Sequence, residues 1–115
     1  MRKPISKNVH GVIDYSYAVI VPLLPEIVGF RKEVLAKALC RGLGAGALSY
    51  TLLTKAPWGL LRLIPFKAHL AIDTSVSCLA IAAPWLLGFS RNSIARNALI
   101  ATGVIGLVAS LLSSP

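Results

Sequence analysis

The sequence predicts an all-α fold, an integral membrane four-helix bundle made of two tandem parallel helical-hairpin repeats. The first observation is composition: 56% of the residues are hydrophobic, 14% are charged and the mean hydropathy is +0.74. Soluble domains average about 45–50% apolar and about 25% charged residues. The second is a set of four apolar runs of about the 20 residues that a bilayer crossing needs. The third is an internal repeat. A chain of 115 residues then has no room for a large catalytic domain outside the membrane, so we expect no enzyme activity.

The internal repeat emerges when the chain is aligned with itself at an offset of 59 residues. His10 and Asp14 then fall on His69 and Asp73, and seven of the 21 positions from 10 to 30 are identical. Chance similarity between apolar helices would not align His, Asp, Pro and Gly together. We therefore predict a single membrane domain over residues 1–115, with one repeat unit at 10–54, an interfacial link at 55–68 and a second unit at 69–113.

The first unit holds two apolar runs, residues 9–30 and 34–54. The first run follows a basic start and lacks a small-x-small cleavage site, so we expect a retained helix and not a removed signal peptide. The second run begins with Glu33, Lys37 and Arg41 at i, i+4 spacing. Because such charges support one another on a helix face, this helix is expected to extend beyond the lipid core.

The second unit repeats the pattern with apolar runs at residues 69–89 and 94–112. The link between the units is too short to span the membrane and is interrupted by Pro57 and Pro65. Its apolar side chains stand among the basic residues Lys55, Arg62 and Lys67, as in segments that lie in the headgroup plane. We predict that Trp58, Leu61 and Phe66 of the link lie near the acyl boundary.

With two crossings per unit, both chain termini lie on one side of the membrane. The two units are then parallel, and an axis along the membrane normal relates them. The terminal side carries six basic residues: Arg2, Lys3, Lys7, Lys55, Arg62 and Lys67. The opposite side also carries six: Arg31, Lys32, Lys37, Arg41, Arg91 and Arg96. The positive-inside rule therefore gives a tie, and only the basic amino terminus favours a cytoplasmic side. The formal net charge of +8 is expected to meet lipid headgroups and not nucleic acid.

The pairs His10–Asp14 and His69–Asp73 are the strongest chemical signal in the sequence. Residues at i, i+4 share a helix face, and ionisable groups inside a membrane segment are costly. Three functional hypotheses remain open: a metal or haem site, a proton or ion path, and a headgroup or quinone pocket. The structural alternative is that each pair satisfies itself or bonds across to the other unit. We expect the structural role, with no cofactor and no resident metal.

A second repeated motif, Pro-x-x-x-Gly-Phe, stands near the far end of the first and third runs. Its residues, with the tryptophan that follows the second proline, are Pro25, Gly29, Phe30, Pro84, Trp85, Gly88 and Phe89. Since proline breaks or ends helices, we predict helix exits there. Phe30, Phe89 and Trp85 are expected to be interfacial anchors.

Small residues on the second and fourth runs predict close helix packing. The glycines assigned to this role are Gly42 and Gly46 in the first unit and Gly103 and Gly106 in the second. Without a polar loop they offer nothing to a phosphate group, so we expect contacts within the bundle or across a dimer. Cys40 and Cys78 fall inside apolar runs and are expected to be small buried hydrophobic residues.

Together the duplicated motifs resemble the SPW repeat family of small bacterial membrane proteins. The resemblance is carried by Ala83-Pro84-Trp85-Leu-Leu-Gly88-Phe89, by the equivalent Leu24–Phe30 segment, and by the stretches 43–54 and 59–73. The serine of the family motif is Ala83 in one unit and Leu24 in the other, and Glu26 replaces the first tryptophan. The resemblance implies a four-helix membrane fold and a bacterial setting, and it brings no established activity.

From these observations we expect a small integral membrane protein of the bacterial cytoplasmic membrane with a structural or accessory role and no catalysis. Its partners would be the lipid bilayer and a second copy or a larger membrane complex. The alternative functions are a small proton- or ion-coupled transporter, or a protein that binds haem, quinone or lipid.

Overall fold

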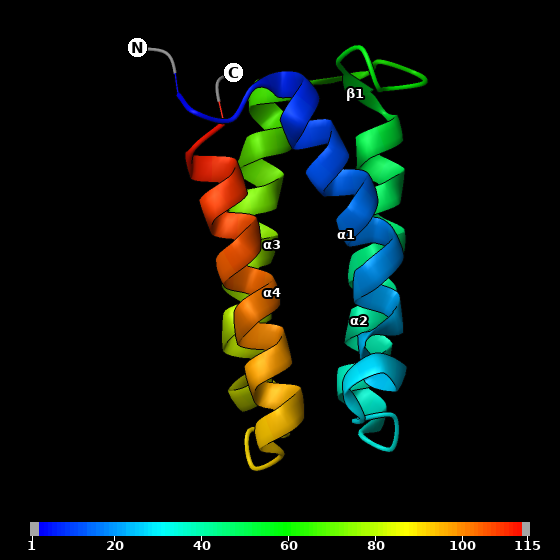
Figure 1. The fold of residues 1–115 in the computed structure, drawn as a ribbon, viewed down its shortest axis with the longest axis vertical. Helices are drawn as coiled ribbons and strands as arrows, with labels where there is room; N and C mark the ends of the chain where they lie inside the picture. The colour runs from blue at the N-terminus through cyan, green and yellow to red at the C-terminus, as the bar shows by residue number, and fades with distance from the viewer. Residues whose placement is uncertain (1–2, 114–115) are drawn as a thin grey trace.

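The computed structural model describes residues 3–113, which form two helical hairpins side by side (Figure 1). The first hairpin is α1 (Lys7–Val28) and α2 (Val34–Leu52), and the second is α3 (Phe66–Leu86) and α4 (Ser93–Leu111). The molecule measures 40 × 27 × 21 Å, with the helices along its long axis. The predicted all-α class is confirmed. Arg2, counted above on the terminal side, lies outside the described residues.

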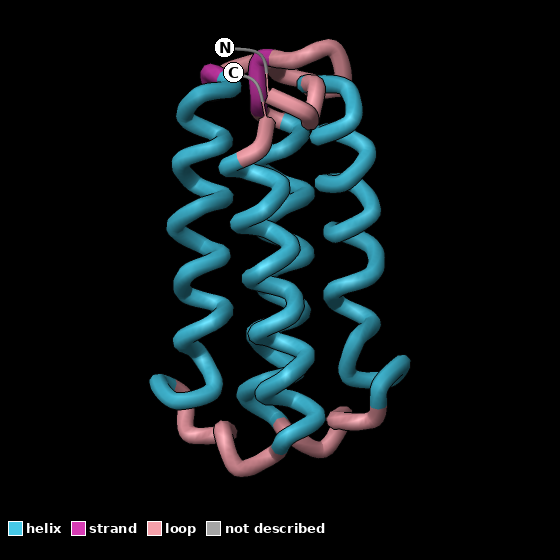
Figure 2. Tube along the Cα trace, turned by 60° about the vertical axis from the view of Figure 1, so that its left-hand side comes forward, coloured by secondary structure: helices cyan, strands magenta, loops and turns pink. Residues whose placement is uncertain are grey.

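Both ends of the described chain lie at the same end of the bundle (Figures 1 and 2). Ile5 forms a parallel bridge with Ser113, and the Ile5 amide donates to the Leu112 carbonyl at 3.0 Å. At the same end, the link between the hairpins forms a parallel pair of two-residue strands, β1 (Thr54–Lys55) and β2 (Ile64–Pro65). Figure 2 shows these strands above the helices. We call this end, with the termini and the link, the terminal end.

The Pro-x-x-x-Gly-Phe motif ends helices, as predicted, and the structure shows how. Gly29 and Gly88 take left-handed φ values of 90° and 79°, which glycine adopts without the steric cost of a Cβ atom. The next amide then turns back, so that Phe30 donates to the Pro25 carbonyl at 2.9 Å and Phe89 donates to the Pro84 carbonyl at 2.8 Å. This is the bond pattern of a Schellman helix stop. The prolines themselves lie inside α1 and α3.

The predicted interfacial role of the two phenylalanines is wrong. Phe30 and Phe89 are each only 2% exposed, because the helix stop folds each ring back against the core that also contains Cys40 and Leu99. Trp85 is 58% exposed, so of the three aromatic residues only Trp85 is on the outer surface.

Close helix packing depends on a different glycine in the first hairpin than the sequence indicated. A Cβ atom on Gly44 would collide with Pro22 of α1, and one on Gly103 would meet Ser77 and Ile81 of α3. Gly106 likewise faces Ser77, so the assignments of Gly103 and Gly106 are confirmed. Gly42 and Gly46 face open space, so they make no close contact within the bundle, and the alternative of a contact across a dimer stays a prediction.

The two cysteines differ in burial, because they fall on different faces of their helices. Cys40 is buried in the core, as expected, whereas Cys78 is exposed. The prediction of a buried position is therefore wrong for Cys78.

The outer surface of the bundle is apolar. Large hydrophobic side chains are exposed along all four helices, including Val12 at 68%, Val34 at 69% and Leu86 at 68%. Within the described chain, three helices, α1, α3 and α4, are long and apolar enough to cross a membrane. The fourth, α2, carries Lys37 and Arg41 in its first turns.

We expect Gly44→Ala to lower the thermal stability of the purified protein, because the added methyl group meets Pro22 and the Ala18 carbonyl. Overpacking of this kind costs about 1–3 kcal/mol. The matched control is Gly46→Ala on the same helix, which faces open space and should stabilise the helix by about 0.5–1 kcal/mol. Thermal unfolding in detergent measures both variants. Equal shifts for the two would contradict the packing described here.

Candidate functional site

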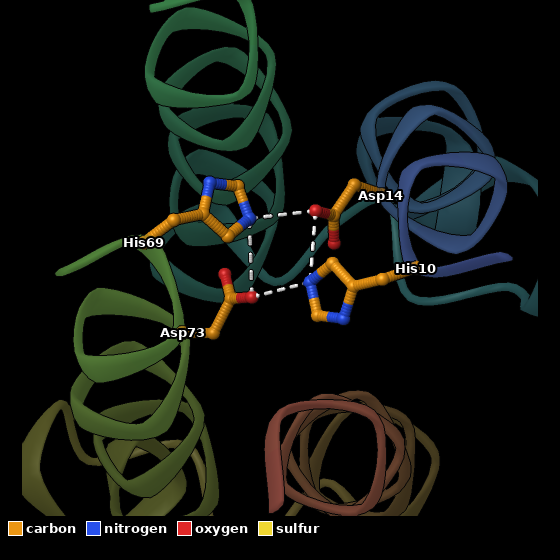
Figure 3. A group of neighbouring side chains, drawn as sticks. All are labelled: His10, Asp14, His69 and Asp73. Carbon is orange, nitrogen blue, oxygen red and sulfur yellow. Dashed lines mark hydrogen bonds and ion pairs between the residues drawn. The ribbon is translucent and has the colours of Figure 1, made fainter. Parts of the chain in front are cut away.

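Two histidines and two aspartates from the first turns of α1 and α3 meet inside the terminal end of the bundle (Figure 3). His10 and His69 are fully buried, and Asp14 and Asp73 are 8% and 7% exposed. We call these four residues the His–Asp quartet. The sequence identified all four and left open whether each pair is self-contained or bonds across to the other unit.

The quartet does both, because each imidazole contacts two carboxylates. His10 Nε2 lies 3.0 Å from Oδ2 of Asp14, on its own helix, and 2.9 Å from Oδ2 of Asp73 on the other hairpin. His69 Nε2 lies 2.7 Å from Oδ2 of Asp14 and 3.3 Å from Oδ2 of Asp73. Figure 3 shows the resulting ring, in which nitrogen and oxygen atoms alternate. The shorter contact of each imidazole is the one that joins the two hairpins.

The outer nitrogen of each imidazole is held by a hydroxyl group from the other part of the chain. His10 Nδ1 lies 2.7 Å from Oγ of Ser113, just beyond the end of α4. His69 Nδ1 lies 2.7 Å from Oγ1 of Thr54 in β1. Ser113 and Thr54 are both fully buried.

These hydroxyl groups determine whether the Nδ1 atom of each imidazole is protonated. Ser113 donates its one hydroxyl proton to the Ala109 carbonyl, and Thr54 donates its proton to the Tyr50 carbonyl at 2.5 Å. Each hydroxyl oxygen can then only accept a hydrogen bond from the imidazole. Both rings therefore carry an Nδ1–H group, and both present Nε2 to the carboxylates.

Aromatic side chains pack against the imidazoles of the quartet. Phe66 is stacked on His69 with an interplanar angle of 18°, and it meets His10 edge-on at a centroid distance of 5.4 Å. Trp58 contacts His69 at 5.5 Å, and its indole nitrogen donates to the Lys7 carbonyl at 2.8 Å. The Tyr15 hydroxyl donates to the Trp58 carbonyl at 2.7 Å. The link thus packs over the buried imidazoles.

This packing corrects the expectation for the link. Phe66 is 5% exposed and belongs to α3, while Trp58 is partly buried against the imidazoles. The prediction is wrong for Phe66, because α3 already begins at this residue and the ring packs against the imidazoles. The hydrogen bond of the Trp58 indole to the Lys7 carbonyl holds that ring partly inward. Leu61 remains outward, at 61% exposed, as do Leu60 and Leu63 at 75% and 67%.

A small cavity borders the two carboxylates. It measures about 20 Å³ and is lined by Asp14, Tyr17, Tyr50, Asp73 and Ser77 together with apolar residues. The hydroxyl group of Tyr50 donates to Oδ1 of Asp73. A polar cavity of this size has room for one water molecule.

Sequence analysis missed the two hydroxyl residues, although a signal for them exists. Thr54 and Ser113 are themselves related by the offset of 59 residues, one position beyond the last repeat match considered. The predicted motif residues Pro25, Gly29, Pro84 and Gly88 lie at the opposite end of the helices and not at the quartet.

We expect Thr54→Val to destabilise the protein by about 1–3 kcal/mol, because it leaves the buried Nδ1–H group of His69 without an acceptor. Thr102→Val is the matched control, since Thr102 is also buried and its hydroxyl group donates only to the Ala98 carbonyl of its own helix. Thermal unfolding in detergent compares the two. Equal losses of stability would mean that the hydroxyl–imidazole contact contributes nothing.

The chain matches no protein-family model, no curated protein and no solved structure.

Proposed function

We propose that the chain is an integral membrane protein with a structural or accessory role and no catalytic activity. In this proposal all four helices cross the membrane, and the His–Asp quartet joins the two hairpins near one membrane surface. The observation that carries it is the buried cross-pairing of His10 with Asp73 and of His69 with Asp14, at 2.9 and 2.7 Å. No other part of the described chain joins the hairpins through buried ionisable groups.

The distribution of polarity supports insertion into a membrane. The described chain exposes leucine, isoleucine and valine along its sides and buries two histidines and two aspartates, the reverse of a soluble domain. An apolar groove of about 460 Å³ also runs between α1 and α4, where acyl chains would pack. For α2, the Arg41 guanidinium bonds the Pro22 carbonyl at 2.6 Å and pairs with Glu26. These contacts compensate the charge of Arg41.

Duplication of a helical hairpin is part of the proposal. The bounds of α2 and α4 correspond at the offset of 59 residues, as do the two helix stops and the two hydroxyl–imidazole contacts. At the end opposite to the quartet, the amide of Asn92 donates to the equivalent Glu33 at 3.3 Å. Contacts between equivalent positions at both ends are what a twofold axis along the bundle would produce.

The proposal has three further parts. The chain belongs to the SPW repeat family, it lies in a bacterial cytoplasmic membrane, and it assembles with a second copy or a larger complex. They are supported by the sequence motifs and by the apolar exterior. A cytoplasmic location of the termini is favoured by the basic amino terminus alone.

The membrane topology has a direct test. We expect reporter domains fused to the amino and to the carboxyl terminus to give the same side of the membrane. A reporter inserted at residues 31–32, in the turn between α1 and α2, should give the opposite side. Alkaline phosphatase, active outside the cytoplasm, and green fluorescent protein, fluorescent inside it, provide paired signals. Opposite signals from the two termini would refute an even number of crossings.

The role of the quartet is tested by neutralising its carboxylates. We expect Asp14→Asn and Asp73→Asn each to destabilise the protein by about 3–5 kcal/mol, because one partner of a buried ion pair is lost and the other stays buried. The double variant should lose less than the sum of the single variants, since all four residues share one network.

Glu26→Gln is the control for these variants. Glu26 pairs with Arg41 on the surface, with side chains 34% and 43% exposed, and exposed pairs are worth about 0–1 kcal/mol. Thermal unfolding in detergent compares these four variants with the parent protein. If the aspartate variants are as stable as the parent, the quartet does not hold the hairpins together.

A further inference from the structure

Four atoms face one another in the middle of the quartet. The two carboxylate oxygens can donate an electron pair to a metal ion, and so can each Nε2 atom that carries no proton. The four atoms are Nε2 of His10 and His69 and Oδ2 of Asp14 and Asp73. The two carboxylates place two negative charges in a buried site, which requires two compensating positive charges. Two additional protons, one on each Nε2 atom, supply them. A single divalent cation supplies the same charge at the same place.

The spacing of the four atoms fits a metal ion. The nitrogen–oxygen distances around the ring are 2.7, 2.9, 3.0 and 3.3 Å, and one ligand atom from each residue lies within 4.8 Å of all the others. Ligands at about 2.0–2.1 Å from a tetrahedral Zn²⁺ ion are separated by about 3.3–3.4 Å. To surround a tetrahedral ion, the shortest edge of the ring would widen from 2.7 Å by about 0.6–0.7 Å, and the separations across the ring, which are within 4.8 Å, would close toward the same value.

The groups behind the four atoms are those that a metal site needs. Metal-ligating histidines typically donate their other ring N–H to an oxygen atom, and ligating carboxylates are themselves hydrogen-bonded. Here Ser113 and Thr54 accept from the two Nδ1–H groups, and Tyr50 donates to Asp73. The cavity beside both carboxylates has room for one water molecule, which would supply a further ligand.

We propose that the His–Asp quartet binds one divalent first-row transition-metal ion through His10 Nε2, His69 Nε2 and one carboxylate oxygen each of Asp14 and Asp73. The inference rests on the proposed function in one respect, since it takes the quartet as the buried joint between the hairpins. Two imidazoles and two carboxylates suit Zn²⁺, Fe²⁺ or Mn²⁺, whereas Mg²⁺ and Ca²⁺ prefer sites made of oxygen alone. The charge of the site stays balanced when one divalent ion binds and the two Nε2 protons are released to the solvent.

The test uses the full-length protein, purified in detergent without a histidine tag and stripped with a chelator. Titration with Co²⁺ is expected to reach one ion per chain and to give the visible absorption of Co²⁺ bound by nitrogen and oxygen ligands. Zn²⁺ should displace Co²⁺ and raise the midpoint of thermal unfolding, because a ligand that binds only the folded state stabilises it. The same concentration of Mg²⁺ should do neither.

Variants locate the site. We expect His69→Gln to weaken Co²⁺ binding by roughly 100-fold or more, since it removes a ligand, and Ser113→Ala by about 10–100-fold, since it removes a contact that orients one. Glu26→Gln, a carboxylate on α1 outside the quartet, should bind as the parent does. Circular dichroism confirms that each variant is folded. Binding that is unchanged in His69→Gln would overturn the proposal.

The wild-type protein alone also decides the question. An absence of saturable Co²⁺ and Zn²⁺ binding would overturn the metal site. If Asp14→Asn nevertheless lowers the unfolding midpoint, the joint between the hairpins that the proposed function describes stands without a metal. Conversely, one bound ion per chain in a protein that alkaline carbonate extracts from membranes would support the metal site and refute membrane insertion.

Discussion

The burial of two carboxylates inside an apolar bundle is the constraint on which the rest of the structure depends. A charge in such a place is tolerated only when it is paired and hydrogen-bonded, and Asp14 and Asp73 are met by both imidazoles. For each imidazole the shorter contact is the one that crosses to the other hairpin. The quartet side chains at the start of α1 and α3 therefore join the two hairpins at the terminal end.

The same constraint explains why the termini and the link are ordered around the quartet. The Nδ1 atom of His10 needs an acceptor, and Ser113 provides it only if the end of α4 is held close, as the bridge between Ile5 and Ser113 does. Thr54 stands in the same relation to His69, within the β1–β2 pair. The β1–β2 pair and the Ile5–Ser113 bridge thus bring two hydroxyl groups to the buried imidazoles. Each hairpin supplies the acceptor for the histidine of the other.

The opposite end of the bundle is organised by backbone conformation and not by charge. At Gly29 and Gly88 the chain turns through a left-handed residue, and the following phenylalanine ring returns to the core. Between the two ends, contact within each hairpin is made close by Gly44 in one and Gly103 in the other. Because small residues permit close approach of helices without a hydrophobic driving force, this packing suits a bundle whose outer surface is apolar.

The sequence by itself determined the helical class, the approximate helix bounds, the helix stops and the four residues of the quartet. These follow from the length of the apolar runs, the internal repeat, the helix-breaking Pro and Gly residues, and the cost of ionisable groups among apolar ones. Only the tertiary structure decided which carboxylate meets which imidazole, that Phe66 and Trp58 turn inward over the quartet, and that Gly44 and not Gly42 or Gly46 is in contact. Those outcomes depend on the rotation of each helix about its axis and on the path of the link. Both are determined by contacts between residues far apart in the chain, such as His10 with Asp73 and Thr54 with His69, which no local pattern encodes.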